Sequence, residues 1–458
     1  MINTTAFDHH GGQQIRIFSR EPIFAFWFFL SIYFLIYEAP VLQSRVLAII
    51  ANFWWLLLPL MISGPVWQWW KQYWEIRYAK TIYDNLIFLR VQLPPEIERT
   101  PAGMEQIFQG IHGMARSYIR WSDRTFFRIR NAWLSFELVG IGGQLYFIIG
   151  CEKQRRAFVE AHLYSQYPDI QIEEVADYTQ ALPADAPNDQ WKMWGVQYVL
   201  ELEDYWILRT YKDWELDKES EPGRKVDPMA QLAEVCATLK PGEQIWIQII
   251  ASARVSDAWF ERAQLIRRAW NFGERGVIKK ANVGEQVFNG VMDFFRIVAG
   301  KELDPSAKEE QQVRYYLSEI EKNIVMQFGS KLTFPIYEVN MRAIYWGSAE
   351  VYDRKDNAIN GFLRPFDDYT NNNIRMDNRT RIRNRNFPQV FPEWRLKRKA
   401  KRILWHYKTR FLNPSLSFRL NTSELASIYH FPGREAASGA IKRLPFKRVQ
   451  PPGDLPVV

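Results

Sequence analysis

The sequence is poor in the residues from which many catalytic and metal centres are built. Only two cysteines, Cys151 and Cys236, occur in 458 residues, and neither belongs to a C-x-x-C pair. Nothing in their spacing indicates a zinc site or a disulfide framework. Each cysteine lies in or beside an apolar segment, so we expect two reduced, partly buried thiols.

Short catalytic motifs are lacking as well. The chain contains no G-x-x-x-x-G-K-[ST] loop, no H-E-x-x-H and no G-x-S-x-G. The six histidines are scattered along the sequence and suggest no set of metal ligands. We therefore predict no catalytic residues, no cofactor and no metal. An enzyme of unrecognised type is the alternative that these absences leave open.

Long charge-free runs are present near the N-terminus. Residues 22–37 and 46–70 contain no acidic or basic side chain, and the second run is long enough to cross a hydrocarbon core of about 30 Å. The expectation is a transmembrane hairpin over residues 22–70 after a tail of residues 1–21. Basic residues flank the pair on both sides, at Arg16, Arg20, Lys71, Arg77 and Lys80. This places both termini in the cytoplasm of a multi-pass inner-membrane protein. A buried apolar hairpin is the alternative.

Residues 84–176 have the pattern of a β-α-β-β-α-β module. The expected strands are 86–93, 133–139, 145–149 and 170–175, with helices over about 101–118 and 152–166. Glycines at 140, 142 and 143 indicate a hairpin turn between the two middle strands. The order is that of the ferredoxin-like fold, a scaffold that does not name a function.

Residues 191–370 predict a second α/β module, joined to the first by a polar linker over 177–190. Strands are expected at 196–202, 205–211, 244–251 and 332–346, and a helical insertion at 256–300. Asp227 and Pro228 are placed as the N-cap and first residue of a helix. The predicted fold class is α+β: two N-terminal transmembrane helices followed by ferredoxin-like and related α/β modules.

Positive charge is concentrated in residues 371–412. Between Arg375 and Arg410 the chain has 13 Lys or Arg and two acids, net +11, whereas the whole chain carries +8. The candidate binding residues are one extended row, Arg379, Arg381, Arg383 and Arg385, and one helix face, Arg395, Arg398, Lys399 and Arg402. Three interpretations compete: a solvated surface paired within the molecule, nucleic-acid binding through phosphates, and contact with anionic lipid.

The C-terminal extension, residues 413–458, carries the motifs of a family resemblance. Asn421 and Glu424 are placed as in a capping box, within N-x-x-E-L-A, and H-F-P follows at 430–432 and P-P-G-D-L-P at 451–456. This series resembles the stretch just upstream of the motor in HerA/FtsK-class ATPases of type IV secretion and conjugation. Q-Y-P-D at 166–169 and the block over 227–248 resemble two further passages of that family.

The resemblance covers roughly residues 50–458 and includes no catalytic motif. The chain stops where the motor would begin, so the resemblance implies a stand-alone version of the membrane-anchored N-terminal half, without ATPase chemistry. We expect a non-enzymatic adaptor or scaffold subunit of a type IV secretion-like machine that transfers DNA or protein. Its expected partners are the lipid bilayer, a separate ATPase, nucleic acid and further copies of itself. The alternative is a membrane-tethered nucleic-acid-binding module acting without a motor.

Overall fold

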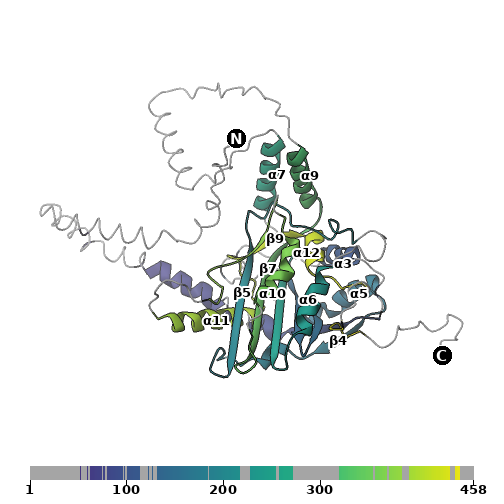
Figure 1. Cartoon of the computed structure of the whole chain (residues 1–458). Helices are drawn as coiled ribbons and strands as arrows, with labels where there is room; N and C mark the ends of the chain where they lie inside the picture. The colour runs from purple at the N-terminus through teal and green to yellow at the C-terminus, as the bar shows by residue number, and fades with distance from the viewer. Residues whose placement is uncertain are drawn as a thin grey trace, which may run out of the picture.

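The structure is a computed structural model of the 458-residue chain. It describes residues 62–74, 80–95, 101–113, 132–183, 185–216, 227–253, 257–271, 319–353, 356–368, 371–383, 391–433 and 439–443, together with residues 33, 52, 59, 76, 77, 97, 122 and 126. These residues form an α+β body around one nine-stranded sheet (Figure 1).

The first half of the sheet has ferredoxin-like order. Its elements are β1 (Leu86–Gln92), α3 (Pro101–His112), β2 (Trp133–Ile141), β3 (Gln144–Glu152), α5 (Arg156–Gln166) and β4 (Gln171–Val175). The strands lie in the order β4-β1-β3-β2, with every neighbouring pair antiparallel. Gly142 and Gly143 connect β2 to β3 with φ values of 58° and 78°, the left-handed conformation that a tight hairpin needs.

The second half repeats the same topology. It consists of β5 (Trp191–Leu200), α6 (Pro228–Ala237), β6 (Glu243–Ser252), β7 (Ile336–Ser348), α10 (Asp356–Leu363) and β8 (Ile374–Met376). The strand order β6-β7-β5-β8 mirrors that of the first half. The strand expected at 205–211 is wrong, because these residues form turns and irregular backbone, in which Leu208 N and Tyr211 N donate to side chains of α12 instead of to a neighbouring strand.

The two halves join through β2 and β6. These strands pair antiparallel from Trp133 opposite Ser252 to Ile141 opposite Gln244, so the sheet is continuous. A further strand, β9 (Phe418–Asn421), pairs with the start of β7. Helices α7 (Asp257–Asn271) and α9 (Glu319–Thr333) are inserted between β6 and β7, pack on each other and extend beyond the end of the sheet (Figure 1).

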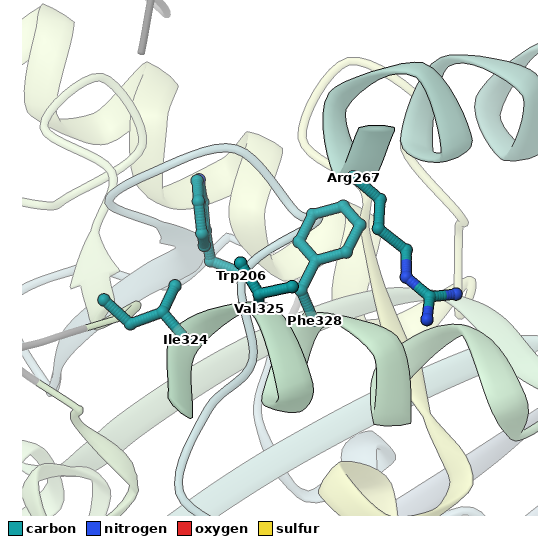
Figure 2. A pocket seen from close by; sticks show the side chains of 5 residues that line it. All are labelled: Trp206, Arg267, Ile324, Val325 and Phe328. Atoms are coloured by element: carbon teal, nitrogen blue, oxygen red, sulfur yellow. The ribbon is translucent and has the colours of Figure 1, made fainter. Parts of the chain in front are cut away.

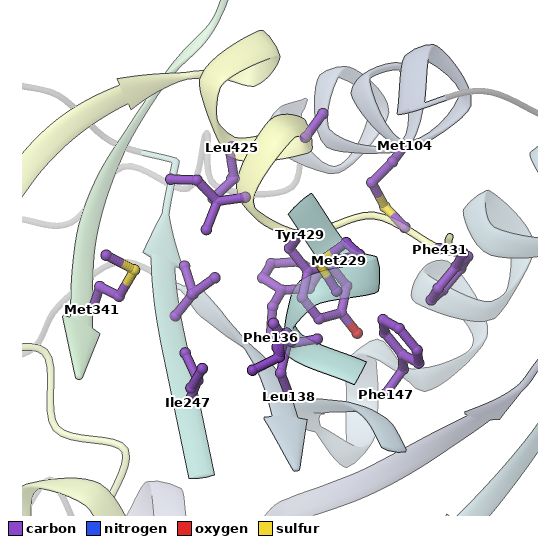
Figure 3. Close-up of a cluster of buried hydrophobic side chains, with 14 of the residues drawn as sticks. Met104, Phe136, Leu138, Phe147, Met229, Ile247, Met341, Leu425, Tyr429 and Phe431 are labelled. Carbon is purple, nitrogen blue, oxygen red and sulfur yellow. The ribbon is translucent and has the colours of Figure 1, made fainter. Parts of the chain in front are cut away.

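One face of the sheet carries the main core. Helices α3, α5, α6, α10 and α12 (Thr422–Ile428) bury apolar side chains against it, among them Met104, Met229 and Leu425 (Figure 3). The other face is covered by α11 (Pro392–Lys408), whose Ala400, Ile403, Leu404 and Tyr407 pack with Trp246 and Trp346. Helix α11 therefore has one buried side and one side turned away from the body.

The predicted transmembrane hairpin over 22–70 is contradicted. Among the described residues, no helix is both long enough and apolar enough to cross a bilayer. Residues 62–74, 76–77 and 80–84 are helical, so the described helical residues of the apolar run, 62–70, lead directly into Lys71. Most of 22–61 and the whole of the predicted tail, 1–21, lie outside the described residues. The described residues form an α+β fold with no transmembrane helix among them, and the same finding contradicts the inner-membrane localisation that was inferred from the hairpin.

Candidate functional site

The three sequence blocks that carry the family resemblance meet in the core. Asn421 and Glu424 form the capping box of α12, as predicted. The Phe431 ring, in the H-F-P motif, lies 5.1 Å from the ring of Tyr167, in the Q-Y-P-D motif. His430 Nε2 lies 3.1 Å from Oδ1 of Asp227, which caps α6 as predicted. These contacts connect both halves of the sheet to the segment that contains α12.

Charge at the His430–Asp227 contact favours the ionised carboxylate. Burial by itself would raise the pKa of Asp227, but the neighbouring His430 and the Met229 backbone N–H hold that pKa below its ordinary value. Both side chains are buried in the contact between α6 and α12. The pair closes the junction between these two helices.

A second buried cluster fixes the C-terminal end of α11 to the sheet. Arg410 donates Nε to Glu137 at 3.1 Å, and its two terminal nitrogens reach the two oxygens of Asp177 at 2.7 and 2.9 Å. Tyr178 donates its hydroxyl to Glu137 at 2.7 Å and lies 2.8 Å from the hydroxyl of Tyr407. Burial alone would raise the pKa of Asp177, yet the bidentate bonds from Arg410 keep it below its ordinary value.

Arg342 on β7 also holds the C-terminal end of α11, by donating hydrogen bonds to it. Its guanidinium donates to the carbonyl oxygen of His406 at 2.6 Å, to that of Phe411, and to Oε1 of Gln248 at 3.0 Å. A cation at the last carbonyls of a helix is favourable for the helix dipole. Burial lowers the pKa of Arg342 to about 9 and that of His406 to about 3, so the histidine is neutral at physiological pH.

Helix α11, positioned in this way, turns a cationic face outward. Five exposed basic side chains lie on it: Arg395, Lys397, Arg398, Lys401 and Arg402. None of the five forms an ion pair with an acid in the described part of the chain, and Glu393 is the only acidic residue of α11. We call these five residues the basic face.

Three aromatic side chains of α11 and its N-cap are also exposed. Trp394 is 59% exposed, Trp405 39% and Phe391 74%. The Arg398 guanidinium lies over the Trp394 ring, 5.3 Å from its centroid. At 100° per residue, Trp394, Arg398, Lys401 and Trp405 fall on one stripe opposite the buried Ile403 and Tyr407.

The predicted binding residues divide between surface and scaffold. Arg395, Arg398 and Arg402 are exposed on the basic face, and Arg379 and Arg383 are exposed in the preceding loop. Arg381 and Lys399 are half-buried, with Lys399 Nζ donating to the Arg381 carbonyl at 3.3 Å. Arg385 lies outside the described residues.

The row expected from Arg379 to Arg385 is not extended at its start, because residues 378–380 form a turn in which Arg381 N donates to Asp377 O. Sequence reasoning also missed Lys397, Lys401 and the two tryptophans. A helical wheel centred on the apolar residues 400, 403, 404 and 407 would have found them.

Features of a catalytic centre are scarce in the described residues. No group of three or more His, Cys, Asp or Glu side chains is placed to hold a metal ion there. A shallow pocket near α7 and α9 is lined by Trp206, Arg267, Ile324, Val325 and Phe328, and this lining includes no nucleophile and no general base (Figure 2). Both cysteines are free and buried, and burial raises their pKa values to about 12.

Comparison with known proteins supplies no further assignment: no protein-family model matches the chain, and no curated protein matches it.

Proposed function

We propose that this chain is a non-enzymatic adaptor that binds nucleic acid through the basic face of α11. The observation that carries the proposal is the row of five exposed cations on one helix without acidic partners in the described part of the chain. A solvated helix of purely structural role usually mixes charges of both signs along its exposed side. A one-sign face matches the regular negative charge of a phosphate backbone.

The way α11 is held supports the same proposal. Arg410 and Arg342 have no or almost no exposed surface, and each is engaged with acids or carbonyl groups of the protein. The positive charge of this region thus falls into two groups, one that builds the scaffold and one that faces outward. Binding sites on regular, well-anchored elements keep their geometry better than sites on loops.

A separate ATPase of the HerA/FtsK class is the partner that the family resemblance suggests. The three resembling blocks pack on each other around Phe431 and His430, so the similarity concerns the folded body. Co-purification of the tagged chain from its native host, followed by mass spectrometry, tests this part. Recovery without any such motor would count against the partnership and leave the nucleic-acid proposal standing.

The direct test measures binding of a labelled mixed-sequence oligonucleotide by fluorescence anisotropy over a range of salt concentrations. In the test variant, Arg395, Arg398, Lys401 and Arg402 are each replaced by Gln. Its matched control replaces four exposed lysines of other elements, Lys153, Lys192, Lys240 and Lys442.

The proposal predicts tight binding at low salt that weakens steeply as salt rises, by about 0.7 to 0.9 in logarithmic slope for each phosphate contact. The test variant should lose most of the affinity and most of the slope, and the control should keep both. Equal binding by test and control variants, or no binding by the wild-type chain at 50 mM salt, would refute the proposal.

A further inference from the structure

We infer that the outward side of α11 takes single-stranded nucleic acid, with Trp394 and Trp405 as stacking platforms for unpaired bases. This inference rests on the proposed function and deepens it, because it names the class of nucleic acid. It starts from an observation that phosphate binding alone does not explain: two tryptophans and a phenylalanine are exposed among the cations.

The exposed aromatics lie where a strand that follows the basic face would pass. Trp394 and Trp405 are eleven residues apart on one stripe, about 16 Å along the helix axis, with Arg398 and Lys401 between them. That order, ring, cation, cation, ring, matches a strand whose phosphates meet the cations while bases at either end stack on the rings.

Each of the two tryptophan rings contacts a neighbouring side chain. Trp394 is covered on one side by the Arg398 guanidinium, at 5.3 Å from the ring centroid. Trp405 packs against His406 and Phe411, with centroid distances of 5.3 and 5.6 Å. A ring fixed by packing loses less conformational entropy when a base stacks on it.

Phe391 adds a third aromatic at the start of the helix. It has a φ of 54°, a left-handed conformation that is unfavourable for a bulky residue, and its side chain is 74% exposed. It stands at the N-cap position and makes no side-chain capping bond. Both features suit a residue retained for what its ring contacts outside the molecule.

Unpaired bases are the occupant that this chemistry favours. In a duplex the faces of the bases are hidden within the stack, so exposed tryptophans would add little to its binding. The stripe also offers no Asn, Gln, Ser or Thr side chain for reading base edges, so the preference should be for single strands of any sequence. An acidic protein segment would satisfy the cations and leave the rings without a role.

The test compares a 20-nucleotide single strand, the same sequence as a duplex, and polyglutamate, each titrated against the full-length chain. The wild-type chain should bind the single strand at least about tenfold more tightly than the duplex. The variant with Trp394→Ala and Trp405→Ala should lose roughly fivefold per ring on the single strand and almost nothing on the duplex. A variant with Phe at both positions should recover most of the affinity.

A matched control replaces Leu265 and Met326, which are exposed apolar residues of α7 and α9, with Ala. It should bind like the wild type. An iodouracil-substituted single strand, irradiated in the complex, should cross-link to Trp394 or Trp405, as mass spectrometry of the peptides would show.

Failure of this inference can be told apart from failure of the proposed function. One outcome refutes only the stacking role: the four-Gln variant loses binding, the single strand and the duplex bind equally, and the tryptophan variant binds like the wild type. The proposed phosphate contacts would then still stand. If polyglutamate binds as tightly as the single strand, the surface belongs to an acidic protein and both proposals are refuted.

Discussion

The Nε atom of Arg410 lies 3.1 Å from Oε1 of Glu137, and neither side chain has exposed surface. Glu137 lies on β2, whereas Arg410 follows α11, so the pair connects two segments 273 residues apart. The pair, together with Asp177, fixes the end of α11 against the sheet. The orientation of the basic face depends on this buried anchor.

Replacement of Arg410 by Met should destabilise the fold strongly. It would leave Glu137 and Asp177 buried without their cation, and breaking a buried pair in this way costs about 3–5 kcal/mol. Urea denaturation followed by circular dichroism measures the free energy of unfolding. As a control, Arg402→Met removes an exposed cation and should change that free energy by less than about 0.5 kcal/mol. Similar losses in both variants would show that the cluster is not an anchor.

Protonation of Asp177 should contribute to the loss of stability at acidic pH. Its folded-state pKa lies below the ordinary value, so its stabilisation is present above the unfolded pKa of about 3.9 and is lost as the pH falls through the folded value. Asp177→Asn should therefore be less stable than the wild type at pH 7. The difference in the free energy of unfolding between the two proteins should become smaller below pH 4. Denaturation at several pH values measures this. Asp189→Asn, at an exposed position, is the matched control.

The buried pair between Lys331 and Glu424 should behave as a coupled unit. Lys331 Nζ lies 3.1 Å from Oε1 of Glu424, both side chains are fully buried, and the pair ties α9 to α12. Lys331→Met should cost about 3–5 kcal/mol, because a buried carboxylate loses its cation. Adding Glu424→Gln should recover part of that loss. A double-mutant cycle measures the coupling, and strictly additive effects would contradict it.

The backbone conformation of Phe391 should lower the stability of the fold, and its ring should strengthen the binding of a single strand. Its left-handed backbone costs a non-glycine residue about 1–2 kcal/mol, so Phe391→Gly should raise the free energy of unfolding by up to about 1 kcal/mol. Phe391→Ala removes the ring and keeps the backbone strain, so it should be less stable than the Gly variant. Both should bind the single strand more weakly than the wild type. Thermal denaturation and anisotropy together measure the two effects, and equal stability of both variants would contradict the strain.

The two cysteines should be unreactive in the folded protein. Burial raises the pKa values of Cys151 and Cys236 to about 12, and the thiolate is the reactive form. An aromatic disulfide reagent at pH 8 should therefore modify almost no thiol in the native state and two per chain in denaturant. Rapid modification of either cysteine in the native protein would contradict this prediction, because it would show that the structure around that cysteine opens.

Local structure was largely predictable from the sequence. The strand and helix order between 86 and 175, the hairpin at Gly142 and Gly143, the Asp227 cap and the Asn421–Glu424 capping box all follow from short-range patterns. Such features depend on the spacing of apolar residues and on the conformations that glycine, proline and capping side chains allow. The long charge-free runs misled the prediction, because apolar length alone does not show what a helix lies against.

The amino-acid sequence by itself determined the two α/β segments, the local caps and the concentration of positive charge between residues 375 and 410. Only the tertiary structure decided that β2 pairs with β6, that His430 meets Asp227, and that Arg410 is a buried anchor while Arg398 faces outward. The reason is physical. The charge of a side chain follows from its residue type, whereas its exposure and its contacts depend on packing between segments that can be hundreds of residues apart.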